Sequence, residues 1–109
     1  MTNMRIERDC LGEMEIPNDR YYGIQTIRNM KVSGAAGFPV VAYPDMHKAL
    51  CQIKKACAKA NAEIGAMKPE IAQAIAAACG KVIAGGYEKE FPLDMWQGGG
   101  YTCVNMNVN

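Results

Sequence analysis

The sequence predicts a mainly α-helical protein with a small β-strand or hairpin at its N-terminus. Apolar residues recur every three or four positions over residues 46–64 and again over 71–83, which predicts two principal helices. Apolar and charged side chains alternate near the start of the chain, which predicts the strand. With 109 residues and a mass of 11.9 kDa, the chain is long enough for one domain, residues 1–109.

The strand or hairpin is predicted within residues 4–16. Met14 and Ile16 would lie on one face of a strand, and the glutamates beside them on the other. Leu11 and Gly12 would supply the turn.

A short helix is predicted over about residues 20–29. Pro17 ends the strand pattern, and the Asn18-Asp19 pair that follows it offers a helix cap. Residues 31–44 contain repeated glycine and proline and no sustained period, so we expect a loop there.

The first long helix is predicted to follow Pro44, with Asp45 as its cap, and to stop at Gly65. At 1.5 Å per residue such a helix is about 30 Å long. Its apolar stripe is predicted to consist of Met46, Leu50, Ile53, Cys57, Ala60 and Ile64.

The second long helix is predicted to start at Pro69, with Glu70 in its first turn, and to end at Gly85. Its stripe consists of Ile71, Ile75, Cys79, Val82 and Ile83, and the rest is largely alanine. A helix that is apolar nearly all round is covered on more than one side. We therefore expect contact with other subunits or with helices outside this chain, and self-association of the exposed faces. A poor local amphipathic pattern is the alternative.

Charge and cysteine usage exclude several classes of protein. The net charge is +1 and the pI is about 7.6, so bulk charge does not favour nucleic acid or membranes. We expect no transmembrane helix, no signal peptide and a cytoplasmic location, where thiols stay reduced. Metal-ligand spacing is absent, so no metal site is predicted. The five cysteines are Cys10, Cys51, Cys57, Cys79 and Cys103, most of them expected to fill helix interfaces.

The segment QGGGYTCVNMNVN, residues 97–109, is the strongest candidate for a functional site. Three glycines allow close approach of a ligand to the backbone, and the segment after them can enter a helix. Backbone N–H groups at a helix start, together with the Thr102 hydroxyl, suit a carboxylate or a phosphate. The segment is neither a P-loop nor a dinucleotide-binding fingerprint. A glycine turn without a ligand is the alternative.

Two other residues, His47 and Cys103, are of types that can act in catalysis. His47 lacks a carboxylate or thiol arranged around it in the sequence, so we expect a surface or helix-end histidine. Cys103 would be a nucleophile if a helix N-terminus activated it, but no base partner is identifiable. No catalytic residue is therefore predicted within the chain.

Two long segments resemble the aspartase/fumarase family. RIERDCLGEMEIPNDRYYGIQTIRN is similar to the family's opening, and IAAACGKVIAGGYEKEFPLDMWQGGGYTCVNMNVN is similar to its first active-site segment. The resemblance extends from about Arg5 to Asn109. YYGIQT at residues 21–26 and QGG at 97–99 resemble the aspartate-deaminating branch rather than the fumarases.

The resemblance implies an N-terminal domain of a fumarase/aspartase-like helical protein. Such enzymes interconvert L-aspartate with fumarate and ammonia without an organic cofactor, and some respond to divalent metal. They are homotetramers built on a helical bundle, and each active site draws on three subunits. A serine base in a flexible loop removes a proton, and donors around a carboxylate stabilise the dianionic intermediate. The expected partners are a small dicarboxylate and further copies of the chain.

The resemblance also implies the site residues. Thr102 would donate to the substrate carboxylate, with Gly100, Tyr101, Cys103 and Asn105 as further substrate-binding positions, while Asn107 would help to hold the helix start. The family pattern has glycine where Tyr101 stands and serine where Cys103 stands. Because a thiol is a weaker donor than a hydroxyl, the second departure would alter or remove a contact.

Length distinguishes this chain from the family, whose members run to several hundred residues. The segments after the first motif, including the loop with the serine base, are absent, so we expect an N-terminal piece without lyase activity of its own. Fumarate hydratase activity is one alternative, and another fumarate-releasing substrate is a second. A non-catalytic helical interaction module, with a structural glycine loop, is a third.

Overall fold

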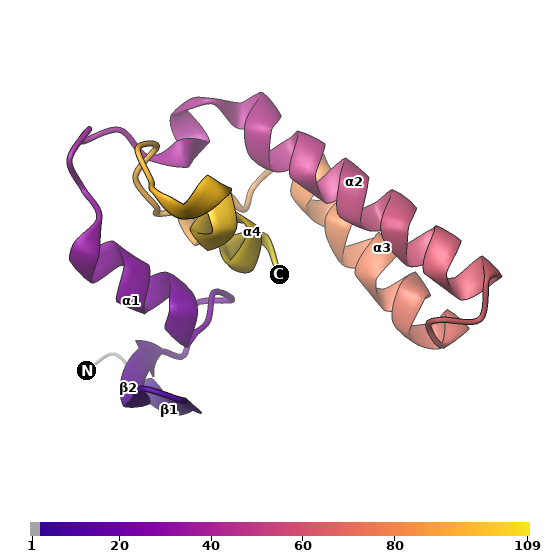
Figure 1. Cartoon of the computed structure of the whole chain (residues 1–109), viewed down its shortest axis with the longest axis horizontal. Coiled ribbons are helices and arrows are strands. Elements are labelled where there is room, and N and C mark those ends of the chain that lie inside the picture. Colours follow the sequence, from indigo (N-terminus) through magenta and orange to yellow (C-terminus); the bar gives the residue numbers. More distant parts are fainter. Residues whose placement is uncertain (1–2) are drawn as a thin grey trace. The chain divides into compact units, whose positions relative to one another are not determined.

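The computed structural model describes residues 3–109, and within them it contains four α-helices, one two-stranded sheet and three short 3-10 helices (Figure 1). The prediction of a mainly helical chain with an N-terminal hairpin is confirmed. The chain divides into two compact units, residues 3–42 with Lys89–Asn109, and Tyr43–Glu88. Across the described part of the chain, the helices are too short or too polar to traverse a bilayer.

The hairpin of the first unit pairs β1 (Met4–Asp9) with β2 (Gly12–Pro17) in antiparallel register. Ile16 is fully buried, and along β2 Met14 and Ile16 face inward while Glu13 and Glu15 are exposed, as predicted; on β1 the exposed residues include Met4 and Ile6. The predicted turn at Leu11-Gly12 is wrong by one residue, because Cys10 and Leu11 form it. The Asp9 carboxylate accepts from the Leu11 backbone N–H at 2.9 Å, a local bond that sets the turn and lets β2 begin at the glycine.

Helix α1 (Ile24–Val32) begins four residues later than the predicted start at residue 20. The Arg5 guanidinium donates to the carbonyls of Arg20 and Tyr22, both at 2.8 Å, and this holds the segment outside a helix. The helix is capped by Glu7, whose carboxylate accepts from the Ile24 backbone N–H at 2.9 Å. The predicted cap at Asn18-Asp19 is therefore wrong, because a strand residue supplies the acceptor.

A glycine at the N-cap permits this approach. A Cβ atom added at Gly23 would lie 3.1 Å from the Glu7 carboxylate oxygen that caps the helix. Farther along α1, Arg28 donates to both carboxylate oxygens of Asp9 at 2.8 Å. The Arg28 hydrogen bond lowers the pKa of Asp9, so this pair supports folding at neutral pH and is lost as acid protonates the carboxylate.

The core of the first unit joins both ends of the chain. Helix α1 packs beside α4 (Thr102–Val108), as Figure 1 shows. The loop after α1 leads to the 3-10 helix η1 (Val40–Ala42), where the Val40 N–H donates to the Leu93 carbonyl at 2.8 Å. The largest fully buried apolar side chains of this unit are Ile16, Leu93, Val40 and Val104. Burial of these side chains from distant segments makes the N-terminal hairpin and the C-terminal segment one body.

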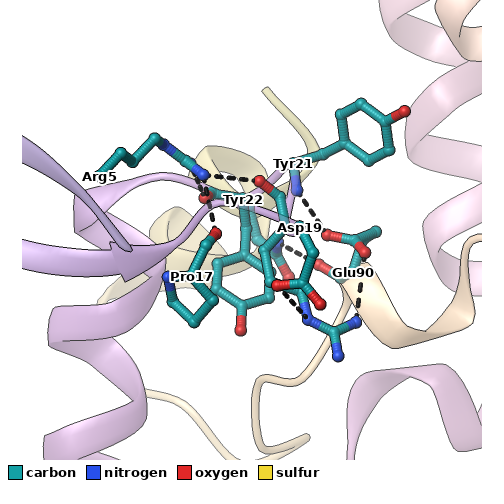
Figure 2. A network of polar contacts seen from close by, with 8 residues as sticks. Arg5, Pro17, Asp19, Tyr21, Tyr22 and Glu90 are labelled. Carbon is teal, nitrogen blue, oxygen red and sulfur yellow. Dashed lines mark hydrogen bonds and ion pairs between the residues drawn. The ribbon is translucent and has the colours of Figure 1, made fainter. Parts of the chain in front are cut away.

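Glu90 fastens the segment before α1 to the segment before the glycines. Glu90 is the last residue of the 3-10 helix η2 (Glu88–Glu90), and its carboxylate accepts from the Tyr21 backbone N–H at 2.8 Å. It also lies 3.4 Å from the Arg20 guanidinium. Figure 2 shows Glu90 beside Tyr21, with the Arg5 contacts to Pro17 and Tyr22 on the same connecting segment.

The second unit is a helical hairpin of α2 (Pro44–Glu63) and α3 (Pro69–Ala84), which lie side by side (Figure 1). Proline at the start of α3, Gly65 after α2 and Gly85 after α3 act as predicted, whereas Pro44 lies inside α2 and not before it. Asp45 is not the cap, because Tyr43 occupies that position and Asp45 lies inside the first turn.

The predicted stripe of α2 is not the packed face. Ile53 and Ile64 are 58% and 77% exposed, and Cys57 is also exposed. The residues buried on this helix are His47, Cys51 and Ala58, and those buried on α3 are Ala72 and Cys79. Helix separation depends on the side chains at the contact, so small residues allow the close packing seen here. The stripe predicted for α3 is partly correct, since Cys79 is buried while Ile71 is 47% exposed.

The buried thiol of Cys51 is expected to resist alkylation. Burial, and to a lesser extent contact with Cys79, raises the pKa of Cys51 to about 11. At pH 8 only about one such thiol in a thousand is ionised, so modification should be at least about 100-fold slower than at exposed Cys57 on the same helix. Timed iodoacetamide labelling with peptide mass mapping measures the ratio.

The same pKa shift predicts a pH dependence of folding. Because folding raises the pKa of Cys51, its contribution to stability is complete below about pH 9 and is lost as the pH approaches about 11. Equal labelling rates for Cys51 and Cys57 in the folded chain at pH 8 would contradict both expectations.

Candidate functional site

The glycine stretch forms a sharp turn into a helix, as predicted. The 3-10 helix η3 (Gly99–Tyr101) ends directly at α4, which begins at Thr102. Gly100 has φ 63° and ψ 37°, and Tyr101 has φ 63° and ψ 20°. Two successive residues in the left-handed conformation turn the chain so that the helix starts at Thr102.

Tyr101 is the one residue other than glycine with positive φ among residues 3–109. A left-handed conformation costs an ordinary L-residue about 1–2 kcal/mol. Replacing Tyr101 with glycine should therefore raise the free energy of unfolding by about 0.5–1 kcal/mol, after the greater flexibility of glycine in the unfolded chain is included. Urea unfolding measures this change.

The control for this prediction is Tyr101→Ala. Alanine removes the ring and keeps the Cβ atom that makes the left-handed conformation costly, so no gain in stability is expected. A gain from alanine equal to that from glycine would show that the ring, and not the backbone, destabilises the turn.

The structure separates the predicted substrate residues into two groups. Gly100, Tyr101, Thr102 and Asn105 are exposed at the beginning of α4. Thr102 and Asn105 are three residues apart on the helix and therefore share one face. Cys103 is half-buried and lies against α1, where its sulfur accepts from the Asn29 side-chain amide at 2.8 Å.

Asp94 organises the loop that leads into the glycines. One carboxylate oxygen accepts from the Gly37 N–H at 2.9 Å, and the other accepts from the Trp96 N–H at 2.7 Å. The Gln97 side-chain amide donates to the Asp94 carbonyl at 2.7 Å. Asp94 is 8% exposed, so its backbone partners replace the water that a charged group requires.

Replacing Asp94 with asparagine should lower the free energy of unfolding by about 2–3 kcal/mol, nearly as much as replacing it with alanine. In the wild type, each carboxylate oxygen accepts from one backbone N–H group. An asparagine side chain has only one acceptor oxygen, so its own NH2 group must point at the second backbone N–H. Urea unfolding of both variants gives the comparison. Wild-type stability in Asp94→Asn would show that the negative charge and second acceptor are unnecessary.

Asn107 makes its contact at the far end of α4, whereas the resemblance implied a role at the helix start. Asn107 is 8% exposed and donates its side-chain amide to the Glu90 carbonyl at 2.8 Å. Sequence analysis did not single out Asn29, Glu90 or Asp94. The contacts of Asn29 with Cys103, of Asp94 with Gly37 and of Glu90 with Asn107 join residues 17 to 74 positions apart, so no local pattern marks these contacts.

Outside the glycine stretch, His47 lies near the start of α2, in line with the expected helix-end position, but it is buried, at 2% exposure, and not at the surface. Burial, and secondarily Lys48, lowers the pKa of His47, while Glu88 acts in the opposite direction. Among the residues that the structure describes, no group of three or more His, Cys, Asp and Glu side chains is arranged to hold a metal ion. The residues of the first unit also form an open pocket of about 240 Å³ beside Asp94, walled by Met30, Phe38 and Pro92, away from Thr102.

Comparison with known proteins gives consistent results. A family model described as "Lyase" matches residues 12–109. Aspartate ammonia-lyase from Pseudomonas aeruginosa is 41% identical over 109 residues, all of this chain and 23% of its own length. Aspartate ammonia-lyase from a Bacillus species is 44% identical over 111 residues, 99% of this chain and 23% of its own length. The chain thus spans about a quarter of the length of the curated relatives it matches.

Solved structures agree in fold. A protein described as fumarate lyase:delta crystallin from Brucella melitensis superimposes with a TM-score of 0.93 at 38% identity, covering 97% of this chain and 25% of that one. A class II fumarase from Schistosoma mansoni superimposes with a TM-score of 0.81 at 34% identity, covering 97% of this chain and 22% of that one.

Proposed function

This chain belongs to the lyase family whose model matches residues 12–109, and on that basis we propose that it is the N-terminal part of an aspartate ammonia-lyase. The proposed reaction is the reversible deamination of L-aspartate to fumarate and ammonia. Identity of 40–44% to proteins with that name, over almost the whole chain, supports this choice of substrate. The match to a fumarase at 34% identity supports the wider family.

The observation that best supports a role in substrate binding is the exposed first turn of α4. Thr102 and Asn105 lie on its exposed face, directly after two left-handed residues. The first N–H groups of a helix have no acceptor within the helix, and a hydroxyl beside them adds a donor. A carboxylate is an anion that such donors can receive.

The chemistry assigns a particular task to these donors. A base removes a proton from the carbon beside the side-chain carboxylate of L-aspartate, and the electron pair is held on that carboxylate as a dianion. The pair then forms the double bond of fumarate while the C–N bond breaks and ammonia leaves. Thr102, Gly100 and Tyr101 would receive the carboxylate as its charge increases, and donors arranged in advance lower the barrier. We assign the role of this base to no residue of this chain.

The other partners are also proposed from the family. We propose a homotetramer whose active site combines residues from several subunits, no organic cofactor, and divalent metal acting only as an activator. The exposed apolar residues of α2 and α3, including Ile53, Ile64 and Ile71, are consistent with further protein contacts.

The test is fumarate formation by the complete polypeptide that carries this sequence, followed by ultraviolet absorbance with L-aspartate and, separately, with L-malate. Turnover of L-aspartate alone is expected. Turnover of L-malate alone would replace the proposal with fumarate hydratase, and turnover of neither would overturn both. The chain of 109 residues by itself should give no signal above a heat-inactivated control.

A further inference from the structure

The contact between α1 and the first turn of α4 links residues 74 positions apart. The Asn29 side-chain amide donates to the Cys103 sulfur at 2.8 Å, and both residues are partly buried. Cys103 directly follows Thr102, so this bond acts on the turn of helix that carries the proposed substrate donor.

Asn29 is itself held in place. The hydroxyl of Ser33, the residue that follows α1 as its C-cap, donates to the Asn29 side-chain oxygen at 2.9 Å. An asparagine amide has a donor end and an acceptor end of nearly equal size, and its neighbours decide which end faces which way. With its oxygen engaged by Ser33, Asn29 presents its N–H group to the sulfur. Three side chains thus form a directed series from Ser33 through Asn29 to Cys103.

Helix α4 needs such a support because it has only seven residues. So short a helix is marginal by itself, and its position depends on packing and on contacts at its ends. Asn107 fastens its last turn to the Glu90 carbonyl at 2.8 Å. The bond from Asn29 is the corresponding contact at the first turn, and it reaches the half-buried Cys103 and not the exposed residues Thr102 and Asn105.

We propose that Asn29 is a positioning residue for substrate binding, which through Cys103 fixes the first turn of α4 and with it the Thr102 donor. The inference rests on the proposed function, since it requires a dicarboxylate at Thr102. Asn29 does not touch the substrate in this proposal. Its effect is to hold one donor where the carboxylate binds, so that less ordering is needed when substrate arrives.

The test compares steady-state kinetics with L-aspartate for the complete polypeptide carrying Asn29→Ala, Cys103→Ala and both changes. Asn29→Ala should raise KM by about 5- to 10-fold and change kcat by less than about 3-fold, because one side-chain hydrogen bond is lost. Cys103→Ala removes the same bond, so the double variant should be no worse than the more affected single variant. Cys103→Ser should have a lower KM than Cys103→Ala, because a hydroxyl oxygen also accepts from the amide.

Lys31→Ala is the matched control, an exposed position two residues along the same helix, and its KM should equal that of wild type. If wild type turns over L-aspartate but Asn29→Ala keeps its KM, or if the two single effects simply multiply in the double variant, the inference is wrong and the proposed function stands. If wild type turns over no L-aspartate, the proposed function fails and this inference fails with it. Loss of stability in Asn29→Ala without a change in KM would mean a purely structural role and would also overturn it.

Discussion

Replacing Arg5 with alanine should lower the free energy of unfolding of the first unit by about 2–4 kcal/mol. Its guanidinium donates to the Pro17 carbonyl at 2.9 Å, and to the Arg20 and Tyr22 carbonyls at 2.8 Å. The same group donates to the Glu7 carboxylate at 2.9 Å. Hydrogen bonds from a charged donor are stronger than neutral ones, and their removal leaves several partly buried acceptors without a partner.

The loss should also be local. Arg5 keeps the segment before α1 extended, and Glu7, which caps α1, is positioned by its bond to Arg5. In Arg5→Ala, the hydrogen-exchange rates of the first amides of α1 should therefore increase relative to wild type more than those of α3, which lies in the other unit. Urea unfolding gives the overall change, and exchange measured by NMR gives its location.

Two variants test the interpretation. Arg5→Lys keeps the charge but lacks the planar group that reaches several carbonyls at once, so it should recover less than half of the loss. Arg8→Ala, at an exposed position of the same strand, should stay within about 0.5 kcal/mol of wild type. If Arg5→Ala is no less stable than Arg8→Ala, the conformation of the segment between β2 and α1 does not depend on the Arg5 guanidinium.

Replacing Thr102 with valine should lower kcat/KM for L-aspartate by about 100- to 1,000-fold in the complete polypeptide. Valine has nearly the shape of threonine and lacks only the hydroxyl that we propose as a donor to the dianionic intermediate. The loss should raise KM and lower kcat, because the hydroxyl binds the substrate carboxylate and its bond strengthens as the charge on that carboxylate grows. Steady-state rates of fumarate formation give both constants.

Thr102→Ser is the matched variant, since it restores the hydroxyl, and it should retain at least about a tenth of the wild-type kcat/KM. Circular dichroism of all three proteins should be alike, because Thr102 is exposed at the helix start. A Thr102→Val enzyme within about 3-fold of wild type would remove Thr102 from the substrate site. It would leave membership of the family untouched, because that rests on the match over residues 12–109.

Much of the candidate site was predictable because its signals are local. The three glycines followed by Thr102 predicted a turn into a helix, and the structure has that turn. Tyr101 shows the limit, since sequence indicated an unusual residue for the family pattern but not that it adopts φ 63°. The bond between Asn29 and Cys103 could not be predicted, because nothing near either residue specifies the other.

By itself, the sequence determined the hairpin, the two long helices and their ends, and membership of the lyase family. These depend on proline at helix starts, glycine at helix ends and side-chain periodicity, which act over a few residues. Tertiary structure alone decided that α1 begins at Ile24 and that Cys103 turns toward α1. It also decided that the packed face of α2 is the one with Cys51 and Ala58. Each of these outcomes depends on a partner far along the chain, such as Glu7 for the start of α1. A helix start or a buried face has several acceptable local solutions, and the distant contact selects one of them.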